Sequence, residues 1–408
     1  MQRWCLSLVL VCAAVTGASS RPQYQLDTGS SAKDGFVLAA ASISAQSPFV
    51  SAVESVVHGG RQLKGLIPLE IDGKPVDKRY VLRMPSAWNG SLVIGAHGGS
   101  GGNNFDRSGK VIGTDETALD DVIGRYAISK GFVYASVDRD GSGGGRAGLA
   151  LTTQFTSLVR TEMTRRGLAK PLRTYLVGLS AGGGITRMAA EEPQTLFDAA
   201  LIIAGAGGDL VTRLDRQMRI AALWPLIDPR AHFGMSLKDP KLEAYAEANG
   251  TPIEARRLWP YTGASAVAAA SRPPGNAENS TGKITIPTIE VVGTWDDLVI
   301  RELRAYAARV EPKDRHRLYQ VEGVWHMSGD DDGVMSFQYI AESRMKLDKD
   351  VADAMGEGPS YLPTVREAFD YLVRWVEKGT PPPQNQTLKP GQALRQQPQA
   401  PGPKAQAP

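Results

Sequence analysis

The fold is decided by one short stretch, residues 174–185, with the sequence Thr-Tyr-Leu-Val-Gly-Leu-Ser-Ala-Gly-Gly-Gly-Ile. Apolar and β-branched residues lead up to Gly178, which is typical of a buried strand, and the residues from 185 to 191 are typical of a helix. Ser180 therefore lies on a turn between a strand and a helix, with Gly178 and Gly182 two residues away on either side. Such small neighbours let the strand and the helix approach closely, and the turn projects the serine hydroxyl away from the sheet.

A serine on this kind of turn resembles the nucleophile elbow of the α/β-hydrolase superfamily, in which the next backbone N–H points into the same space as the hydroxyl. The Gly-x-Ser-x-Gly pattern alone is weak evidence, because the chain contains 44 glycines and the pattern occurs a second time around Ser100. Ser100 follows an apolar run but precedes no helix with a long apolar face, so we interpret that copy as a glycine-rich loop. The strand and helix around Ser180 favour Ser180 as the nucleophile.

The composition is that of an ordinary globular protein. A length of 408 residues suffices for one large α/β domain with insertions or for two domains. The net charge of +3 is too small to indicate a nucleic-acid surface, so we expect no nucleic-acid partner. The acidic pair Asp138 and Asp140 lacks the full ligand set of a calcium loop, and we interpret it as a loop at the rim of the site. We expect no metal and no cofactor.

The first 20 residues have the pattern of a secretory signal peptide. An arginine near the start is followed by an apolar stretch at 4–15 and by small residues at 16–20, which predict cleavage after about residue 18 or 20. The apolar stretch is short for a bilayer span, although an N-terminal anchor is the alternative. Both cysteines, Cys5 and Cys12, lie in this segment, so the mature protein would have no disulfide. We expect a secreted or periplasmic protein with no membrane contact after signal cleavage.

Strands and helices alternate along most of the remaining chain, which indicates a mostly parallel sheet with helices on both faces. Strands are predicted at 65–71, 78–84, 91–96, 132–137, 174–179, 199–204, 287–293 and 318–324, and helices at 117–130, 149–166, 185–191 and 365–375. The predicted division is a signal at 1–20, a hydrolase core at 21–208 and 285–379, a cap or insertion at 209–284, and a disordered Pro/Gln-rich tail at 380–408. The alternative to a cap is a set of extra helices packed beside the sheet.

Three residues occur in the chain order serine, acid, histidine, which is the order of the superfamily. Ser180, Asp296 and His326 each lie just after a predicted strand. A serine hydroxyl needs a base to take its proton, and a carboxylate must hold the imidazole of that base in the right tautomer. We therefore predict Ser180 as nucleophile, His326 as general base and then general acid, and Asp296 as the orienting acid. The adjacent Asp297 is the alternative acid.

The sequence His-Gly-Gly that begins at His97 resembles the oxyanion loop of these hydrolases. The resemblance implies that the N–H groups of Gly99 and Ala181 hold the oxyanion, whereas a turn that only tolerates positive φ is the alternative. His97 itself is expected to be a structural residue of the loop and not a base. Trp295 and Trp325 flank the predicted acid and base, and we expect them to line or back the substrate pocket unless they belong to the core.

The segment 373–382, Val-Arg-Trp-Val-Glu-Lys-Gly-Thr-Pro-Pro, is similar to the end of secreted tannase and feruloyl-esterase relatives. Those enzymes pair a cysteine beside the nucleophile with one beside the histidine, where this chain has Leu179 and, around the histidine, Trp325 and Met327. Secreted polyester-depolymerase-like hydrolases fit equally well.

The resemblance implies an exported serine hydrolase that cleaves small-molecule or polymeric carboxylic esters through an acyl-enzyme. The first alternative is a serine peptidase of the prolyl-oligopeptidase kind, although the chain shows none of the propeller repeats that such enzymes carry. The second alternative is a non-catalytic binding module on a hydrolase scaffold. The complete set of three predicted catalytic residues argues against this second alternative.

Overall fold

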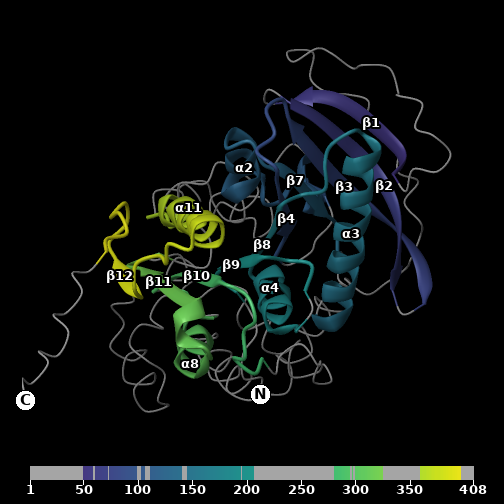
Figure 1. Ribbon diagram of the computed structural model, residues 1–408. Helices are drawn as coiled ribbons and strands as arrows, with labels where there is room; N and C mark the ends of the chain where they lie inside the picture. Colours follow the sequence, from purple (N-terminus) through teal and green to yellow (C-terminus); the bar gives the residue numbers. More distant parts are fainter. Residues whose placement is uncertain are drawn as a thin grey trace, which may run out of the picture. The chain divides into compact units, whose positions relative to one another are not determined.

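The computed structural model describes residues 49–57, 60–71, 73–98, 103–105, 111–139, 145–193, 195–205, 280–294, 296, 299–324 and 359–396. In this part of the chain, ten strands form one sheet, which Figure 1 shows with helices on either side. The strands are β1 (Val50–Val57), β2 (Gly60–Ile71), β3 (Lys74–Pro85), β4 (Ser91–Ala96), β7 (Val133–Val137), β8 (Arg173–Leu179), β9 (Ala199–Ile203), β10 (Thr288–Gly293), β11 (His316–Val321) and β12 (Gln386–Leu388). A separate pair, β5 (Asn103–Phe105) and β6 (Val111–Thr114), is antiparallel.

The sheet is parallel through most of its width. Its strand order is β1-β2-β3-β7-β4-β8-β9-β10-β11-β12, and every neighbouring pair from β7 to β12 is parallel. The pairs β1–β2, β2–β3 and β3–β7 are antiparallel. All residues of β4, β7, β9 and β10 are buried, which is the pattern of strands covered on both faces. The expected α/β-hydrolase architecture, a mostly parallel sheet between helices, is confirmed.

Helices pack on both faces of the sheet over two separate apolar clusters. They are α2 (Arg125–Ser129), α3 (Gly145–Arg165), α4 (Ala181–Glu191), α8 (Ile300–Arg309) and α11 (Leu362–Lys378). One cluster contains buried residues of α2 and α11, such as Ile128 and Phe369, and the other contains buried residues of α3 and α4, such as Phe155 and Ile185. None of the helices in the described part of the chain has both the length and the apolar character to cross a bilayer.

The predicted helix at 117–130 is divided into three pieces. A 3-10 turn (Asp115–Thr117) is followed by a π-helical turn (Asp120–Gly124) and then by α2. The N–H of Gly124 donates to the carbonyl oxygen of Leu119 at 2.9 Å, which widens the helix there. Strands β1, β5, β6 and β12 and helix α8 were not among the predicted elements.

The predicted division needs correction at two places. Residues 209–279 of the predicted cap lie outside the described residues, but its last residues belong to the core, because Ile284 is buried and its N–H donates to Glu311 O at 3.0 Å. The prediction of a disordered tail at 380–408 is wrong for residues 380–396. There β12 pairs in parallel with β11, and Leu388 and Leu394 are buried in the apolar core. These two leucines anchor the Pro/Gln-rich segment together with the buried Pro382 and Pro383.

A buried ion pair joins α4, the helix after Ser180, to β10, the strand before Asp296. Arg187 Nε donates to Glu290 Oε1 and Arg187 Nη2 donates to Glu290 Oε2, each at 3.2 Å. Both side chains are fully buried. The Nε2 atom of His316 lies 3.6 Å from the same carboxylate. Burial alone would raise the pKa of the Glu290 carboxyl, but Arg187 and His316 outweigh this effect and hold that pKa below its usual value.

Because the pKa of Glu290 is lower in the folded state, its stabilising contribution is present above the unfolded pKa of about 4.3 and is lost as the pH falls through the folded pKa. We expect Glu290→Gln to lower the free energy of unfolding by about 3–5 kcal/mol at pH 7, since it removes the carboxylate charge from a fully buried ion pair with Arg187. The difference from the parent should shrink as the pH falls below about 4.

Urea unfolding at pH 7 and at several lower pH values measures both effects. Glu192→Gln is the matched control, because Glu192 forms a solvent-exposed pair with Arg146 and should cost no more than about 1 kcal/mol. A deficit of Glu290→Gln that stayed constant or grew with acidification would contradict the assignment.

Candidate active site

The predicted site residues follow strands that end at the same edge of the sheet. His97 follows β4, Ser180 follows β8, and Asp296 lies three residues after the end of β10. Strand β4 is the direct neighbour of β8, and only β9 separates β8 from β10. All four strands are parallel, so their carboxyl ends lie together, which is where α/β folds place their sites.

Ser180 has a strained backbone conformation. Its φ of 55° and ψ of −119° lie in a region that residues with a side chain rarely adopt and that costs on the order of 1–3 kcal/mol. The surrounding structure holds it there: its N–H donates to Ile203 O on β9 at 2.9 Å, and its carbonyl oxygen accepts from the N–H of Gly184 at 3.2 Å. The predicted turn from strand to helix at Ser180 is confirmed.

The turn depends on two glycines that have no room for a side chain. A Cβ on Gly178 would lie 2.2 Å from Thr186 Oγ1 and 2.3 Å from Gly182 O. A Cβ on Gly182 would lie 1.9 Å from Ala96 O and 2.4 Å from His97 O. The start of α4 therefore packs directly on the backbone at the end of β4, and this contact places Ser180 beside the loop that follows β4.

The loop after β4 lies against Ser180. A Cβ on Gly98 would be 3.1 Å from Ser180 Cβ and 3.8 Å from Ser180 Oγ. Gly99, the predicted oxyanion residue on this loop, lies outside the described residues, as does Ser100. Ala181, the other predicted oxyanion residue, is the first residue of α4 and follows Ser180 directly. Since the first N–H groups of a helix have no partner within the helix, the amide of Ala181 is suited to binding an anion.

His97 is fully buried and bound to backbone groups on both sides of its ring. Its Nε2 accepts a hydrogen bond from the N–H of Arg139 at 3.0 Å, so the ring proton is on Nδ1, which donates to Gly98 O at 3.0 Å. The imidazole thus has no lone pair left for a substrate proton. The prediction that His97 is structural and not a base is confirmed.

His97, Asp115 and Asp138 bring their side-chain donor atoms within 4.8 Å of one another, a spacing that could hold a metal ion. The chemistry of this donor set does not fit one. The Nε2 lone pair of His97 already accepts from a backbone N–H, and Asp138 accepts from the Nε and Nη2 atoms of Arg79 at 3.3 and 3.1 Å. Asp140, the other residue of the predicted acidic pair, lies outside the described residues.

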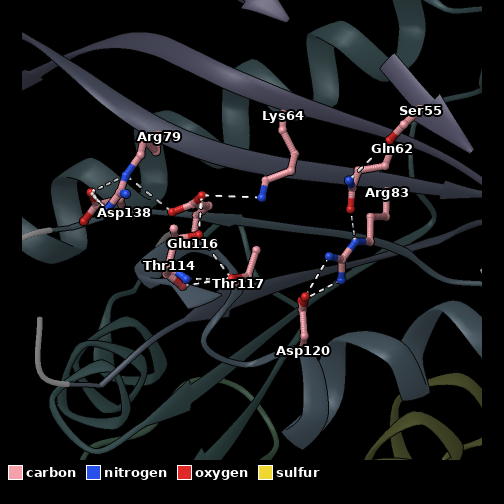
Figure 2. A network of polar contacts seen from close by, with 10 residues as sticks. All are labelled: Ser55, Gln62, Lys64, Arg79, Arg83, Thr114, Glu116, Thr117, Asp120 and Asp138. Atoms are coloured by element: carbon pink, nitrogen blue, oxygen red, sulfur yellow. Dashed lines mark hydrogen bonds and ion pairs between the residues drawn. The ribbon is translucent and has the colours of Figure 1, made fainter. Parts of the chain in front are cut away.

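Arg79 connects Asp138 to a polar network between β3 and the turns after β6. Figure 2 shows Arg79 between Asp138 and Glu116, whose carboxylate also accepts from Thr114 Oγ1 at 2.6 Å. In the same figure, Arg83 donates to both oxygens of Asp120 at 2.5 and 2.7 Å. The pair between Arg79 and Asp138 holds the residue that directly follows β7 and directly precedes Arg139.

Asp296 is almost fully buried and lies in the connection between β10 and α8, before the start of α8 at Ile300. Its N–H donates to Gly293 O at 3.1 Å, and its carbonyl oxygen accepts from the N–H of Ile300 at 2.9 Å. The alternative acid Asp297 lies outside the described residues, as do Trp295, Trp325 and the predicted base His326. The structure therefore brings Ser180, His97, Ala181 and Asp296 to one edge of the sheet, while the geometry around His326 stays a prediction.

We expect Gly182→Ala to lower the free energy of unfolding by about 3 kcal/mol or more, because the added methyl group meets two backbone carbonyl oxygens that have no alternative rotamer. The control is Gly167→Ala, where φ is +83° but nothing lies within 4 Å, so that only backbone strain of about 1–2 kcal/mol is added. Urea unfolding compares the two. A Gly182→Ala protein as stable as Gly167→Ala would contradict the close packing of α4 on β4.

Comparisons with known proteins agree with this architecture. The family described as "Alpha/beta hydrolase domain" matches residues 133–398. Similar solved structures include an esterase from Aspergillus oryzae, with 14% identity, coverage of 79% of this chain and 81% of that chain, and a TM-score of 0.45. Feruloyl esterase B from Aspergillus oryzae has 13% identity, coverage of 79% of this chain and 81% of that chain, and a TM-score of 0.44. Vibralactone cyclase has 12% identity, coverage of 79% of this chain and 83% of that chain, and a TM-score of 0.47.

Structural similarities with such low identities and TM-scores give no information on substrate or mechanism. Comparison with curated protein sequences finds no relative. The family match runs from β7 to the residues after β12, which is more than half of the chain, and it includes the turn at Ser180. The chain therefore belongs to the α/β-hydrolase family.

Proposed function

We propose that this α/β-hydrolase cleaves carboxylic ester bonds with Ser180 as nucleophile. The observation that carries the proposal is the backbone of Ser180, at φ 55° and ψ −119°, beside the buried loop at His97 and Gly98. Strain of this kind persists only where the surroundings impose it, and it is concentrated at functional sites. The choice of an ester rests on the predicted serine, acid and histidine and on the similarity of residues 373–382 to secreted ester hydrolases.

The proposed mechanism has two steps with one covalent intermediate. Ser180 Oγ attacks the ester carbonyl carbon while its proton passes to His326, and a tetrahedral oxyanion forms. The C–O bond to the alcohol then breaks, and the alcohol leaves with the proton from His326. Water attacks the acyl-enzyme with the same histidine as base, which releases the acid and restores Ser180. Asp296 holds His326 in the tautomer that accepts the proton.

The oxyanion is expected to accept hydrogen bonds from the N–H groups of Ala181 and Gly99. The amide of Ala181 is at the N-terminus of α4, where the helix dipole also favours negative charge. A preorganised donor pair of this kind is worth about 10²–10³ in kcat per donor. No metal or cofactor enters the proposal.

We also infer that the protein is exported, from the charged start, the apolar stretch at 4–15 and the small residues at 16–20. The intact mass of the exported protein tests this inference. A mass that lacks about the first twenty residues supports it, and a mature species that retains Cys12 contradicts it.

We expect Ser180→Ala to lower kcat by on the order of 10⁶ while the fold persists, because no nucleophile remains. Asp296→Asn should lower kcat by about 10⁴, since an amide favours the wrong imidazole tautomer. Asp297→Asn is the matched control and should retain most of the parent activity. Steady-state hydrolysis of p-nitrophenyl acetate, butyrate and benzoate, with the corresponding p-nitroanilides, measures all three variants and separates an esterase from a peptidase.

Three results would count against the proposal: more than a tenth of the activity in purified Ser180→Ala, a larger loss in Asp297→Asn than in Asp296→Asn, or faster cleavage of the anilides than of the esters. Circular dichroism and thermal unfolding of each variant establish that the protein compared is folded.

A further inference from the structure

Arg139 binds the loop beside Ser180 through its backbone and its side chain together. Its N–H donates to His97 Nε2 at 3.0 Å, and its Nη2 donates to Gly98 O at 2.9 Å and also to His97 O. His97 Nδ1 donates to the same Gly98 oxygen at 3.0 Å. The two carbonyl groups that precede the predicted oxyanion residue are therefore both held by one guanidinium group.

The held carbonyl determines how the next peptide group is directed. A peptide bond is planar and trans, so the carbonyl of one residue and the N–H of the next point in opposite directions. Fixing the Gly98 carbonyl against Arg139 and His97 therefore constrains the plane of the peptide group that begins at Gly98. The N–H of this peptide group belongs to the residue that the sequence nominates, beside Ala181, as an oxyanion donor.

Arg139 is itself rigidly placed. It is 2% exposed and lies two residues after β7, the direct neighbour of β4 in the sheet. The preceding residue, Asp138, is tied to β3, since its N–H donates to Arg79 O at 2.8 Å and its carboxylate accepts from the Arg79 side chain. A guanidinium group suits the binding of two carbonyl groups because its planar fork offers several N–H donors in fixed directions, whereas a lysine ammonium group is a compact point charge.

We propose that Arg139 is a positioning residue for catalysis, which holds the His97–Gly98 backbone so that the following amide can stabilise the oxyanion formed at Ser180. The inference rests on the proposed esterase mechanism but adds a residue to it. Arg139 does not touch the reacting atoms. Its effect should therefore appear in transition-state stabilisation, with little effect on substrate binding.

The test compares Arg139→Met and Arg139→Lys with Arg83→Met. Arg83 is the matched control because it is also a buried arginine, paired with Asp120, and its strand β3 is separated from β8 by β7 and β4. Concentrations are set by active-site titration, so that only folded enzyme is counted. We measure kcat and KM on p-nitrophenyl butyrate, and the Ki of phenylboronic acid, which forms a tetrahedral adduct on a nucleophilic serine and carries its oxygen in the oxyanion site.

We expect kcat to fall about a hundred-fold in Arg139→Met and about ten-fold in Arg139→Lys, with KM changed little, because misplacing a donor costs transition-state stabilisation. The Ki of the boronic acid should rise in step with the fall in kcat/KM. Arg83→Met should lower the melting temperature but leave kcat and Ki near the parent values. If Arg139→Met does not fold, Arg139→Lys, which keeps the buried charge, decides the question.

Unchanged kcat and Ki in a folded Arg139 variant, with only a lower melting temperature, would overturn the inference and assign Arg139 a structural role alone. So would equal losses in Arg83→Met. Failure of the proposed function looks different, because it appears in the parent protein as absent esterase activity or as activity that survives Ser180→Ala.

Discussion

The structure around the site depends on one close approach, between the start of α4 and the end of β4. The Cα of Gly182 lies so near to Ala96 O and His97 O that no side chain fits between them. This contact requires glycine and sets the nucleophile against the loop at Gly98, while the backbone hydrogen bonds of Ser180 hold its strained conformation. The position that makes Ser180 a candidate nucleophile is thus set by backbone packing, and the proposed chemistry of Ser180 depends on that packing.

Two buried arginines extend this constraint to the strands around it. Arg187 joins α4 to β10 through Glu290, and Arg139 joins the end of β7 to the loop after β4. Each is a cation whose hydrogen bonds are made inside the protein, where an unpaired charge is costly. The elements that carry Ser180, Asp296 and the oxyanion loop are therefore linked by polar contacts as well as by the apolar core.

The sequence predicted the parallel sheet and the turn at Ser180 because those features leave local marks: apolar runs, glycines at fixed spacing, and a helix directly after. It did not indicate the role of Arg139, because the side chain binds backbone carbonyl groups 41 and 42 residues away, and any residue supplies a carbonyl. The sequence also predicted a disordered tail, although Leu388 and Leu394 of this tail are buried in the apolar core. The overall composition of a segment does not show that single residues within it are buried. The prediction of His326 as the base rests on chain order and on its place after the last predicted strand, and the residue lies outside the described residues.

The central claim, that Ser180 is the nucleophile, is tested most directly by covalent labelling. The protein is incubated with a p-nitrophenyl alkylphosphonate, digested, and mapped by mass spectrometry. The account predicts one phosphonyl group per chain, on the peptide that contains Ser180, with release of p-nitrophenol and loss of esterase activity in proportion to labelling. Labelling of Ser100 in the second Gly-x-Ser-x-Gly sequence, or an active protein that takes up no label, would contradict it.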